Sequence, residues 1–471
     1  MQTNFLNTDT ICAIATPHGM GAIATVRVSG AKAFPIVAAL FQHRGKFLEI
    51  SEIVSHKAYH GHLINKGELL DEVLVTFFKA PHSFTGEDSA EISVHGSVFV
   101  QQKLLQVLIA NGCRMAEAGE FTRRAFVNGK FDLAQAEAIA DLISSESEAA
   151  HRVAINQLRG GFSKELQVLR SKLLEMTSLM ELELDFSEED VEFADRSQLK
   201  ALLQEALDKV NRLKDSFRLG NAIKNGVPVA IVGQTNTGKS TLLNALLGED
   251  RAIVSDIAGT TRDTIEETLN INGILFRFID TAGLRETEET IEKIGIERSY
   301  RKIAEATMVI GMLDATKDAE NVLLAAHEIL ERIDLEHQQL ILCINKVDTL
   351  DDQGEALLGR LRTDLDNDEI MVICLSAKHK FGLNDLYNTL KHSQPLSYPD
   401  ATLVTNVRHY EALLHASESL SQVQQGLEMN IPTDLVSQDL RQALHYLGSI
   451  TGEITTEEVL GIVFSRFCIG K

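Results

Sequence analysis

The 471-residue sequence has few cysteines, no long apolar run and fewer basic than acidic residues. Its five cysteines are scattered without a CxxC pair, and the N-terminus lacks the basic and apolar regions of a secretion signal. No apolar stretch is long enough to span a membrane. We therefore expect a soluble, cytoplasmic protein, and the length predicts about three domains.

The charge balance weighs against a general affinity for nucleic acid. Asp and Glu number 67 against 45 Lys and Arg, which gives a formal net charge of −22. Binding to nucleic-acid phosphates normally appears as a basic patch or stripe. Any RNA contact is therefore expected to be local or to be delivered by a partner, and the acidic tract 181–195 is not expected to face RNA.

The most specific motif is the glycine-rich run GQTNTGKS over residues 233–240. It follows an apolar stretch, 227–232, and precedes a helix-like segment, 241–247. Backbone N–H groups of such a turn point inward, and the helix N-terminus adds partial positive charge. We expect Lys239 to reach the terminal phosphates and the Ser240 hydroxyl to bind Mg²⁺. This pattern predicts a nucleoside triphosphate but does not identify the base.

Two downstream motifs identify the base as guanine. NKVD, residues 345–348, closes an apolar strand, and a carboxylate at Asp348 offers acceptors to the N1–H and the exocyclic amine of guanine. Adenine presents an acceptor at N1 and is rejected. SAK, residues 376–378, follows the apolar stretch 371–375 and is expected to back the base.

The segments between these motifs are typical of a GTPase switch. DTAG, residues 280–283, follows a predicted strand and is expected to sense the γ-phosphate and Mg²⁺. GTTRD, residues 259–263, lies in a polar segment that would become ordered when a γ-phosphate and metal are present. Thr261 is the candidate for a second hydroxyl on Mg²⁺.

Leu284 marks a departure from the small GTPases, where a glutamine at this point orients the attacking water. A leucine cannot hold water, and local sequence identifies no arginine finger. The acidic residues after it, Glu286, Glu288, Glu289 and Glu292, are candidates, although most of such a run is expected to be a solvated helix face.

Several tracts together resemble the MnmE (TrmE) family of tRNA-modification GTPases. They are GQTNTGKS, SDIAGTTRD (255–263), DTAGLRE (280–286), IEKIGIER (291–298), the final FCIGK (467–471), TPHGMGAIATVRVSG near the start and GEFTRRAFVNGKFDLAQAEAIADLI in the first third. The resemblance spans the whole chain. It implies contacts to GTP from Asn236, Thr237, Gly238, Lys239, Ser240, Thr241, Ser255, Asp256, Ile257, Ala258, Gly259, Thr260, Thr261, Asp280, Thr281, Ala282, Gly283, Asn345, Lys346, Asp348, Ser376, Ala377 and Lys378.

The resemblance also implies how the bond is cleaved. In this family a potassium ion, held where two GTPase domains meet in a homodimer, takes the place of an arginine finger. Its implied ligands are Asn236, Ser255, Ile257 and Thr260. Glu292 matches the catalytic glutamate that orients water. From the residues alone, Asn236 has the alternative role of stabilising the turn.

A reduced folate, 5-formyl- or methylene-tetrahydrofolate, is the further cofactor that the resemblance implies. The implied folate-binding residues are Arg27, Glu91, Lys130 and the terminal Lys471; a carboxylate suits the amide edge of a pterin, and cations suit a glutamyl tail. Cys468 is implied to be a thiol at the modification site. A buried apolar cysteine is the alternative.

The implied function is a potassium-stimulated GTPase that helps add an aminomethyl or carboxymethylaminomethyl group at C5 of the wobble uridine of certain tRNAs. Its implied partner is an MnmG (GidA)-like flavoprotein, in a heterotetramer or larger complex; the FAD belongs to that partner, since this chain has no dinucleotide-binding fingerprint. Two alternatives stay open: a regulatory switch such as a ribosome-assembly GTPase, and a folate-dependent transferase in which GTP gates access.

The predicted fold is α/β plus α. Residues 1–121 form an α/β folate domain, 122–220 and 394–471 form one helical domain, and an inserted Ras-like GTPase domain, with a mixed sheet flanked by helices, occupies 221–393. Asp132, with Gln135 three residues later, predicts a helix start. Long helices are expected over 150–184 and 198–217.

Overall fold

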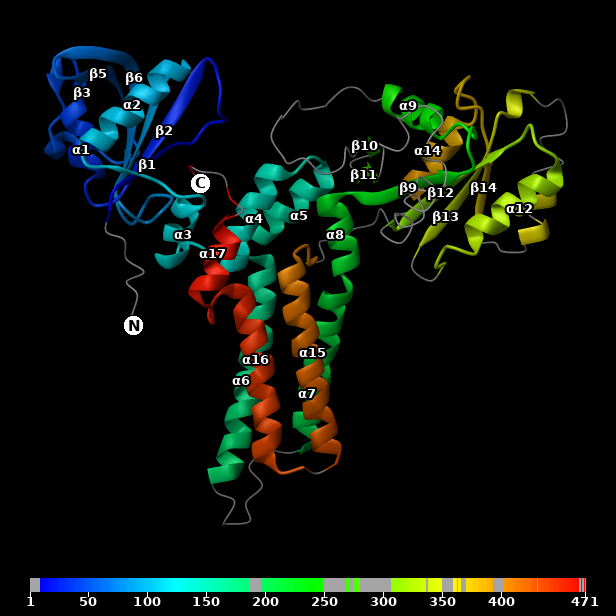
Figure 1. Cartoon of the computed structure of the whole chain (residues 1–471). Coiled ribbons are helices and arrows are strands. Elements are labelled where there is room, and N and C mark those ends of the chain that lie inside the picture. The colour runs from blue at the N-terminus through cyan, green and yellow to red at the C-terminus, as the bar shows by residue number, and fades with distance from the viewer. Residues whose placement is uncertain are drawn as a thin grey trace. The chain divides into compact units, whose positions relative to one another are not determined.

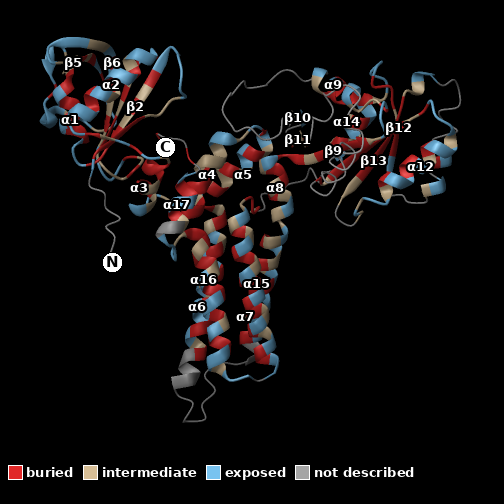
Figure 2. Ribbon diagram, viewed as in Figure 1, coloured by how far each residue is buried: buried red, intermediate tan, exposed pale blue. Residues whose placement is uncertain are grey.

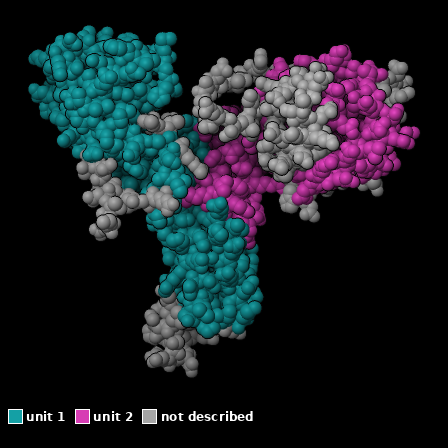
Figure 3. Space-filling view, viewed as in Figure 1, with its two compact units in different colours: residues 1–143, 155–210, 411–471 teal, residues 144–154, 211–410 magenta. Residues whose placement is uncertain are grey.

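The chain divides into two compact units (Figure 3). Unit 1 contains residues 1–143, 155–210 and 411–471, and unit 2 contains 144–154 and 211–410. The structure, a computed structural model, describes residues 9–185, 196–249, 267–271, 274–279, 306–335, 338–349, 359–361, 363–365, 370–392, 402–429, 431–465, 467 and 470. The domain boundaries expected from the sequence stay predictions.

Unit 1 begins with an eight-stranded sheet in the order β4-β3-β5-β6-β7-β2-β1-β8. All neighbours are antiparallel except β1 and β8. The strands are β1 (Ile11–Ile14), β2 (Ile23–Ser29), β3 (Phe41–His43), β4 (Lys46–Phe47), β5 (Ala58–Asn65), β6 (Glu68–Phe78), β7 (Ser89–His95) and β8 (Arg114–Met115).

The two faces of this sheet have different chemistry. Helices α1 (Ala33–Leu40) and α2 (Val98–Ala110) cover one face, where alternate residues such as Val26 and Ile92 are buried in a continuous apolar core. Because side chains alternate along a strand, the neighbours Arg27 and Glu91 lie on the opposite face. The alternation of side chains along the strands therefore places the apolar core on one face of the sheet and the candidate folate residues on the other.

A buried carboxylate joins β8 to the following helix, α3 (Glu120–Val127). Glu120 Oε1 accepts hydrogen bonds from Arg114 Nη2 at 2.7 Å and from Arg124 Nη2 at 2.9 Å. Glu120 Oε2 accepts one from the backbone N–H of Glu117 at 2.9 Å. Burial by itself would raise the pKa of Glu120, but these donors outweigh it and lower the pKa to about 2.

The rest of unit 1 is helical. Helices α6 (Gly161–Asp185) and α16 (Thr433–Thr451) run side by side, and α7 (Arg196–Asp215) and α15 (Val407–Glu428) lie in the same bundle (Figure 1). Buried apolar residues recur every three or four positions in each, as Leu199, Leu203, Ala206 and Val210 do in α7. Helices α4 (Leu133–Ser144) and α17 (Glu457–Ser465) lie with α3 around a small apolar cluster.

Two local predictions had different outcomes. The predicted start at Asp132 is confirmed: Gln135 N donates to Asp132 Oδ1 at 2.8 Å, and Asp132 N donates to Gln135 Oε1 at 3.0 Å. The prediction of one helix over 150–184 is wrong. Helix α5 (Glu148–Leu158) ends before Gly160, whose φ of 79° is left-handed, and α6 begins at the next residue.

Unit 2 contains a six-stranded sheet in the order β10-β11-β9-β12-β13-β14. Only β10 and β11 are antiparallel neighbours. The strands are β9 (Val227–Gly233), β10 (Glu267–Ile271), β11 (Ile274–Phe278), β12 (Met308–Asp314), β13 (Gln339–Asn345) and β14 (Met371–Cys374), and the helices are α8 (Phe217–Asn225), α9 (Lys239–Glu249), α12 (Ala319–Leu330) and α14 (Leu383–His392). Short 3₁₀ turns occur at Ile50–Glu52 in unit 1 and at Val347–Thr349 in unit 2.

Both faces of this sheet are buried. Figure 2 shows β9, β12 and β13 almost wholly buried, and two apolar clusters lie on opposite faces, one containing Ile231 and the other Val232. Such near-continuous apolar strands are typical of a parallel sheet covered by helices on both sides. Since the parallel strands share one direction, their carboxyl ends meet at one edge, where ligands of such sheets bind.

Within the described residues, none of the helices has both the length and the apolar character that crossing a membrane requires.

Candidate functional site

The glycine-rich turn after β9 has the backbone geometry that a phosphate cradle needs. Gly233 and Gly238 have φ of 148° and 97°, and Asn236 has φ of 63°. The Thr237 hydroxyl donates to the Gln234 carbonyl at 2.9 Å and closes the turn. Helix α9 begins directly after Gly238, so its free N–H groups face the inside of the turn.

Lys239 lies folded across this turn. Its Nζ donates to the carbonyl oxygens of Gly233 at 2.8 Å and Gln234 at 2.9 Å. Burial lowers the pKa of Lys239. The ammonium group is therefore held by the backbone of the glycine-rich loop. Ser240 follows it at the first turn of α9, and Thr241 comes next.

The side chain of Asn345, in the NKVD motif, forms hydrogen bonds to both the glycine-rich loop and the SAK motif. Its Nδ2 donates to the Thr237 carbonyl at 2.7 Å, and its Oδ1 accepts from the Ala377 N–H at 2.9 Å. Both bonds are buried, and a side chain at Gly238 would collide with the Asn345 amide. The structure thus brings the phosphate loop, the NKVD motif and the SAK motif to the same edge of the sheet.

The carboxylate of Asp348, which the NKVD motif predicts to read the base, is partly exposed. A hydrogen bond from Ser376, followed by smaller effects that include the charges of His379 and Lys378, lowers the pKa of Asp348. His379 Nε2 lies 3.5 Å from Asp348 Oδ2. The carboxylate is therefore ionised at neutral pH and can accept both donors of the guanine edge.

The other predicted nucleotide residues lie outside the described part of the chain. They are Ser255, Asp256, Ile257, Ala258, Gly259, Thr260, Thr261, Asp280, Thr281, Ala282, Gly283 and Glu292. Cys468 and Lys471 lie outside it as well.

In unit 1 the structure brings two predicted folate residues into contact. Arg27 on β2 lies opposite Glu91 on β7, and Arg27 Nε and Nη2 donate to Glu91 Oε1 at 3.0 and 2.8 Å. The rings of Phe84 and Phe121 flank the guanidinium, with centroids 5.0 and 5.6 Å from its carbon. The side chains of Arg27 and Glu91 are 19% and 33% exposed, so a ligand can reach them.

Lys130 is linked to this pair through the loop that carries Phe84. Its Nζ donates to the Pro81 carbonyl at 3.0 Å. Near the chain end, a side chain at Gly470 would collide with the backbone of Ile14. Ile14 belongs to β1, and Ala13 of that strand pairs with Arg27 on β2, so the residue that precedes Lys471 lies one strand away from Arg27.

Sequence reasoning missed three residues of these sites. Phe84 and Phe121 flank Arg27, and Phe121 lies within a tract that carried the family resemblance. Asp314 holds Lys346 Nζ at 2.7 Å. A signal for Asp314 was present, since it is a polar residue that ends an apolar strand, as Asn345 does.

The parallel sheet, the glycine-rich turn with its lysine and the adjoining guanine-reading motif define a P-loop GTPase. Family models match most of the chain: "GTP-binding protein TrmE N-terminus" over residues 10–130 and "MnmE helical domain" over residues 133–468. The chain belongs to the MnmE family. Three relatives carry the name tRNA modification GTPase MnmE: those of Bacteroides fragilis (52% identical), Bacteroides thetaiotaomicron (51%) and Flavobacterium johnsoniae (50%). Each alignment covers 99% of this chain and 100% of the relative.

Proposed function

We propose that this chain is a potassium-stimulated GTPase that acts with an MnmG-like flavoprotein to add an aminomethyl or carboxymethylaminomethyl group at C5 of the wobble uridine of certain tRNAs. The observation that carries the proposal is the full-length similarity, at 50% identity or more, to relatives named tRNA modification GTPases. The assembled nucleotide loop supports the GTPase part, and the pair of Arg27 and Glu91 supports the folate part.

For hydrolysis, the chain supplies a preorganised cradle. Lys239 would contact the terminal phosphates, while Asp348 would pair with guanine. Ser240 and Thr261 would hold Mg²⁺, which when bound supplies positive charge to the phosphate oxygens. Ser240 fits this role because it lies in the first turn of α9, directly after the loop lysine.

Potassium would bind to Asn236 together with Ser255, Ile257 and Thr260. The side chain of Asn236 is exposed at a left-handed position, and among the described residues it makes no hydrogen bond that would explain it as a turn stabiliser. When bound, the ion supplies positive charge beside the bond that breaks. Glu292 would orient the attacking water in a homodimer of GTPase domains.

The folate site would use Arg27, Glu91, Lys130 and Lys471. Both Arg27 hydrogen bonds fall on Glu91 Oε1, which leaves Oε2 to accept from the amide and amino edge of a pterin. Lys130 and Lys471 would serve the glutamyl tail. The folate, when bound, supplies the one-carbon unit, and FAD would be carried by the partner.

Analysis of tRNA nucleosides tests the function directly. Deleting the gene should remove the C5 modification of wobble uridine, and the wild-type gene, but not an Asn236→Ala variant, should restore it fully. Intact modification in the deletion strain would reject the proposal. In vitro, hydrolysis should be faster in potassium than in sodium, and Asn236→Ala should abolish this preference; an unchanged ratio of the two rates would reject the ion assignment.

Two other functions make different predictions. A regulatory switch, such as a ribosome-assembly GTPase acting only through partner binding, would leave wobble modification intact on deletion. A folate-dependent transferase in which GTP only gates access would still modify tRNA when hydrolysis is blocked but GTP stays bound. The full-length similarity favours the tRNA-modification function over both.

A further inference from the structure

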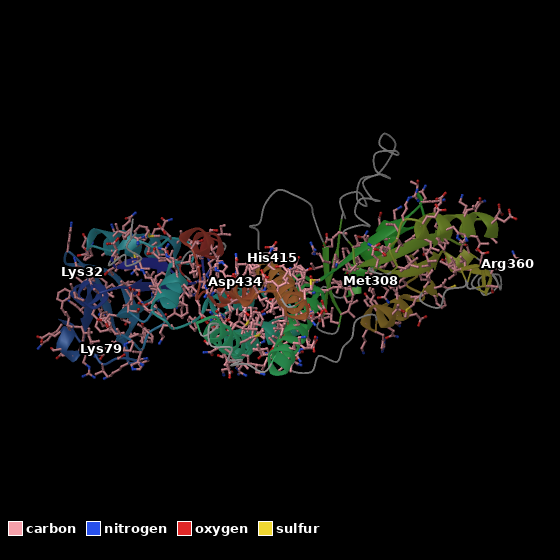
Figure 4. All side chains as sticks on the ribbon, turned by 90° about the horizontal axis from the view of Figure 1, so that it is seen from below. Lys32, Lys79, Met308, Arg360, His415 and Asp434 are labelled. Atoms are coloured by element: carbon pink, nitrogen blue, oxygen red, sulfur yellow. The ribbon has the colours of Figure 1, made fainter. Side chains whose placement is uncertain are left out.

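Lys346 of the NKVD motif is held by a residue outside every nucleotide motif. This residue, Asp314, ends β12, the strand that begins at Met308 (Figure 4), and it lies opposite Asn345 in the parallel pair of β12 and β13. Asp314 Oδ2 accepts a hydrogen bond from Lys346 Nζ at 2.7 Å. The ion pair thus joins the carboxyl ends of two neighbouring strands at the nucleotide-binding edge.

The carboxylate of Asp314 is fixed on its other side as well. Its Oδ1 accepts hydrogen bonds from the Thr316 N–H at 3.0 Å and the Thr316 hydroxyl at 2.7 Å. The side chain is 10% exposed, against 34% for Lys346. Burial would raise the pKa of Asp314, but the bonds from Lys346 and Thr316 outweigh it and lower the pKa. The carboxylate therefore stays charged at neutral pH.

The backbone at Lys346 limits where its side chain can go. Its φ is 67°, a left-handed conformation that costs a residue other than glycine about 1 kcal/mol. This backbone conformation fixes the position of the Lys346 Cβ, and the hydrogen bond to Asp314 fixes the position of Nζ. The apolar four-carbon stem between the two ends is therefore held in one place, with the charge satisfied by protein rather than by substrate.

We propose that Asp314 is a positioning residue for guanine nucleotides, which fixes the stem of Lys346 as one wall of the base site by holding its ammonium group. Asp348 reads the edge of the base, whereas Asp314 and Lys346 set the position of the ring face. Because the base is remote from the bond that breaks, this positioning acts equally on the ground state and the transition state. It should therefore affect KM and leave kcat nearly unchanged.

The test uses the full-length protein and the variant Asp314→Asn, which keeps the size and the acceptor for Thr316 but loses the charge. We expect GDP and GTP to bind about tenfold more weakly, which corresponds to about 1.4 kcal/mol for one charge-assisted bond. KM for GTP should rise in parallel, and kcat should change by less than about twofold. IDP, which lacks the exocyclic amine, should weaken by the same factor, because Asp348 still reads the base edge.

A matched control removes a nearby charge without touching Lys346. Asp318 is an exposed acid at the N-cap of α12 with no side-chain capping bond, and Asp318→Asn should leave GDP binding unchanged. In a Lys346→Met background, Asp314→Asn should have no further effect on GDP affinity. This double-mutant cycle distinguishes action through Lys346 from a general structural role.

Three results would overturn the assignment. The first is an unchanged GDP affinity in Asp314→Asn. The second is that Asp314→Asn weakens GDP binding by the same factor in the Lys346→Met background as in the wild type. The third is that Asp314→Asn changes the ratio of GDP to IDP affinity as much as Asp348→Asn does. Thermal unfolding of the nucleotide-free proteins shows whether the variants fold. If Asp314→Asn does not fold, Lys346→Met alone must weaken GDP binding about tenfold; normal binding would reject the proposal.

Discussion

Removing the Asn345 side chain should loosen the nucleotide site without touching a phosphate contact. In Asn345→Ala, the Thr237 carbonyl loses its donor and the Ala377 N–H loses its acceptor, and all three residues are buried. The methyl group of alanine reaches neither partner. Two buried hydrogen bonds that join the glycine-rich loop to the NKVD and SAK motifs would then be lost.

The size of the effect follows from those two bonds. Each hydrogen bond contributes about 0.5–1.5 kcal/mol net to stability, and a buried donor or acceptor left without a partner costs about 1–3 kcal/mol. Allowing for partial relaxation and water entry, we expect the GTPase unit to lose roughly 2–4 kcal/mol of stability. Nucleotide binding must then reorder the loops, so the affinity for GDP should fall by about ten- to a hundredfold, at about 1.4 kcal/mol for each factor of ten.

Fluorescent GDP titration and thermal unfolding of the nucleotide-free protein measure the two quantities separately. Asn345→Asp keeps an acceptor for Ala377 but places a buried carboxylate oxygen against the Thr237 carbonyl, so its loss should be at least as large as that of Asn345→Ala. Asn384→Ala, at an exposed position on α14, is the control and should change neither quantity. GDP affinity within about twofold of wild type in Asn345→Ala would refute the view that these bonds preorganise the site.

Three further changes test other parts of the chain. The folded-state pKa of Glu120, about 2, lies below the value of 4.5 expected for a solvated glutamate. The stabilisation is therefore present above pH 4.5 and disappears as the pH falls toward 2. The stability gap between wild type and Glu120→Gln, about 3 kcal/mol at pH 7, should therefore shrink in urea unfolding below pH 4.5, and a constant gap would contradict this. Gly220→Ala should lower the melting temperature and the stability of the protein by about 1–3 kcal/mol, because a Cβ at this position would collide with the Val404 carbonyl. Gly461→Ala, where a Cβ on α17 would meet open space, is the control and should not lower the melting temperature. Equal melting temperatures for the two variants would count against the close approach of Gly220 to Val404. Asp348→Asn should weaken GTP hydrolysis and favour xanthosine triphosphate, whose 2-carbonyl accepts from the new amide; a retained preference for GTP argues against base reading.

Local motifs could be predicted because their chemistry lies within a few residues. The turn around Gly238 and the helix start at Asp132 each depend on neighbours in sequence. The helix break at Gly160 was missed because apolar periodicity continues across it, and only the left-handed backbone ends the first helix.

Sequence by itself determined that the chain binds a guanine nucleotide and combines α/β with helical parts, since strand and helix periods and short motifs are local properties. Tertiary structure alone decided which distant residues meet: Arg27 with Glu91 across two strands, Asn345 with Thr237, and Lys346 with Asp314. The physical reason is that such pairs depend on strand order and register, which arise from packing the whole sheet and from no segment alone.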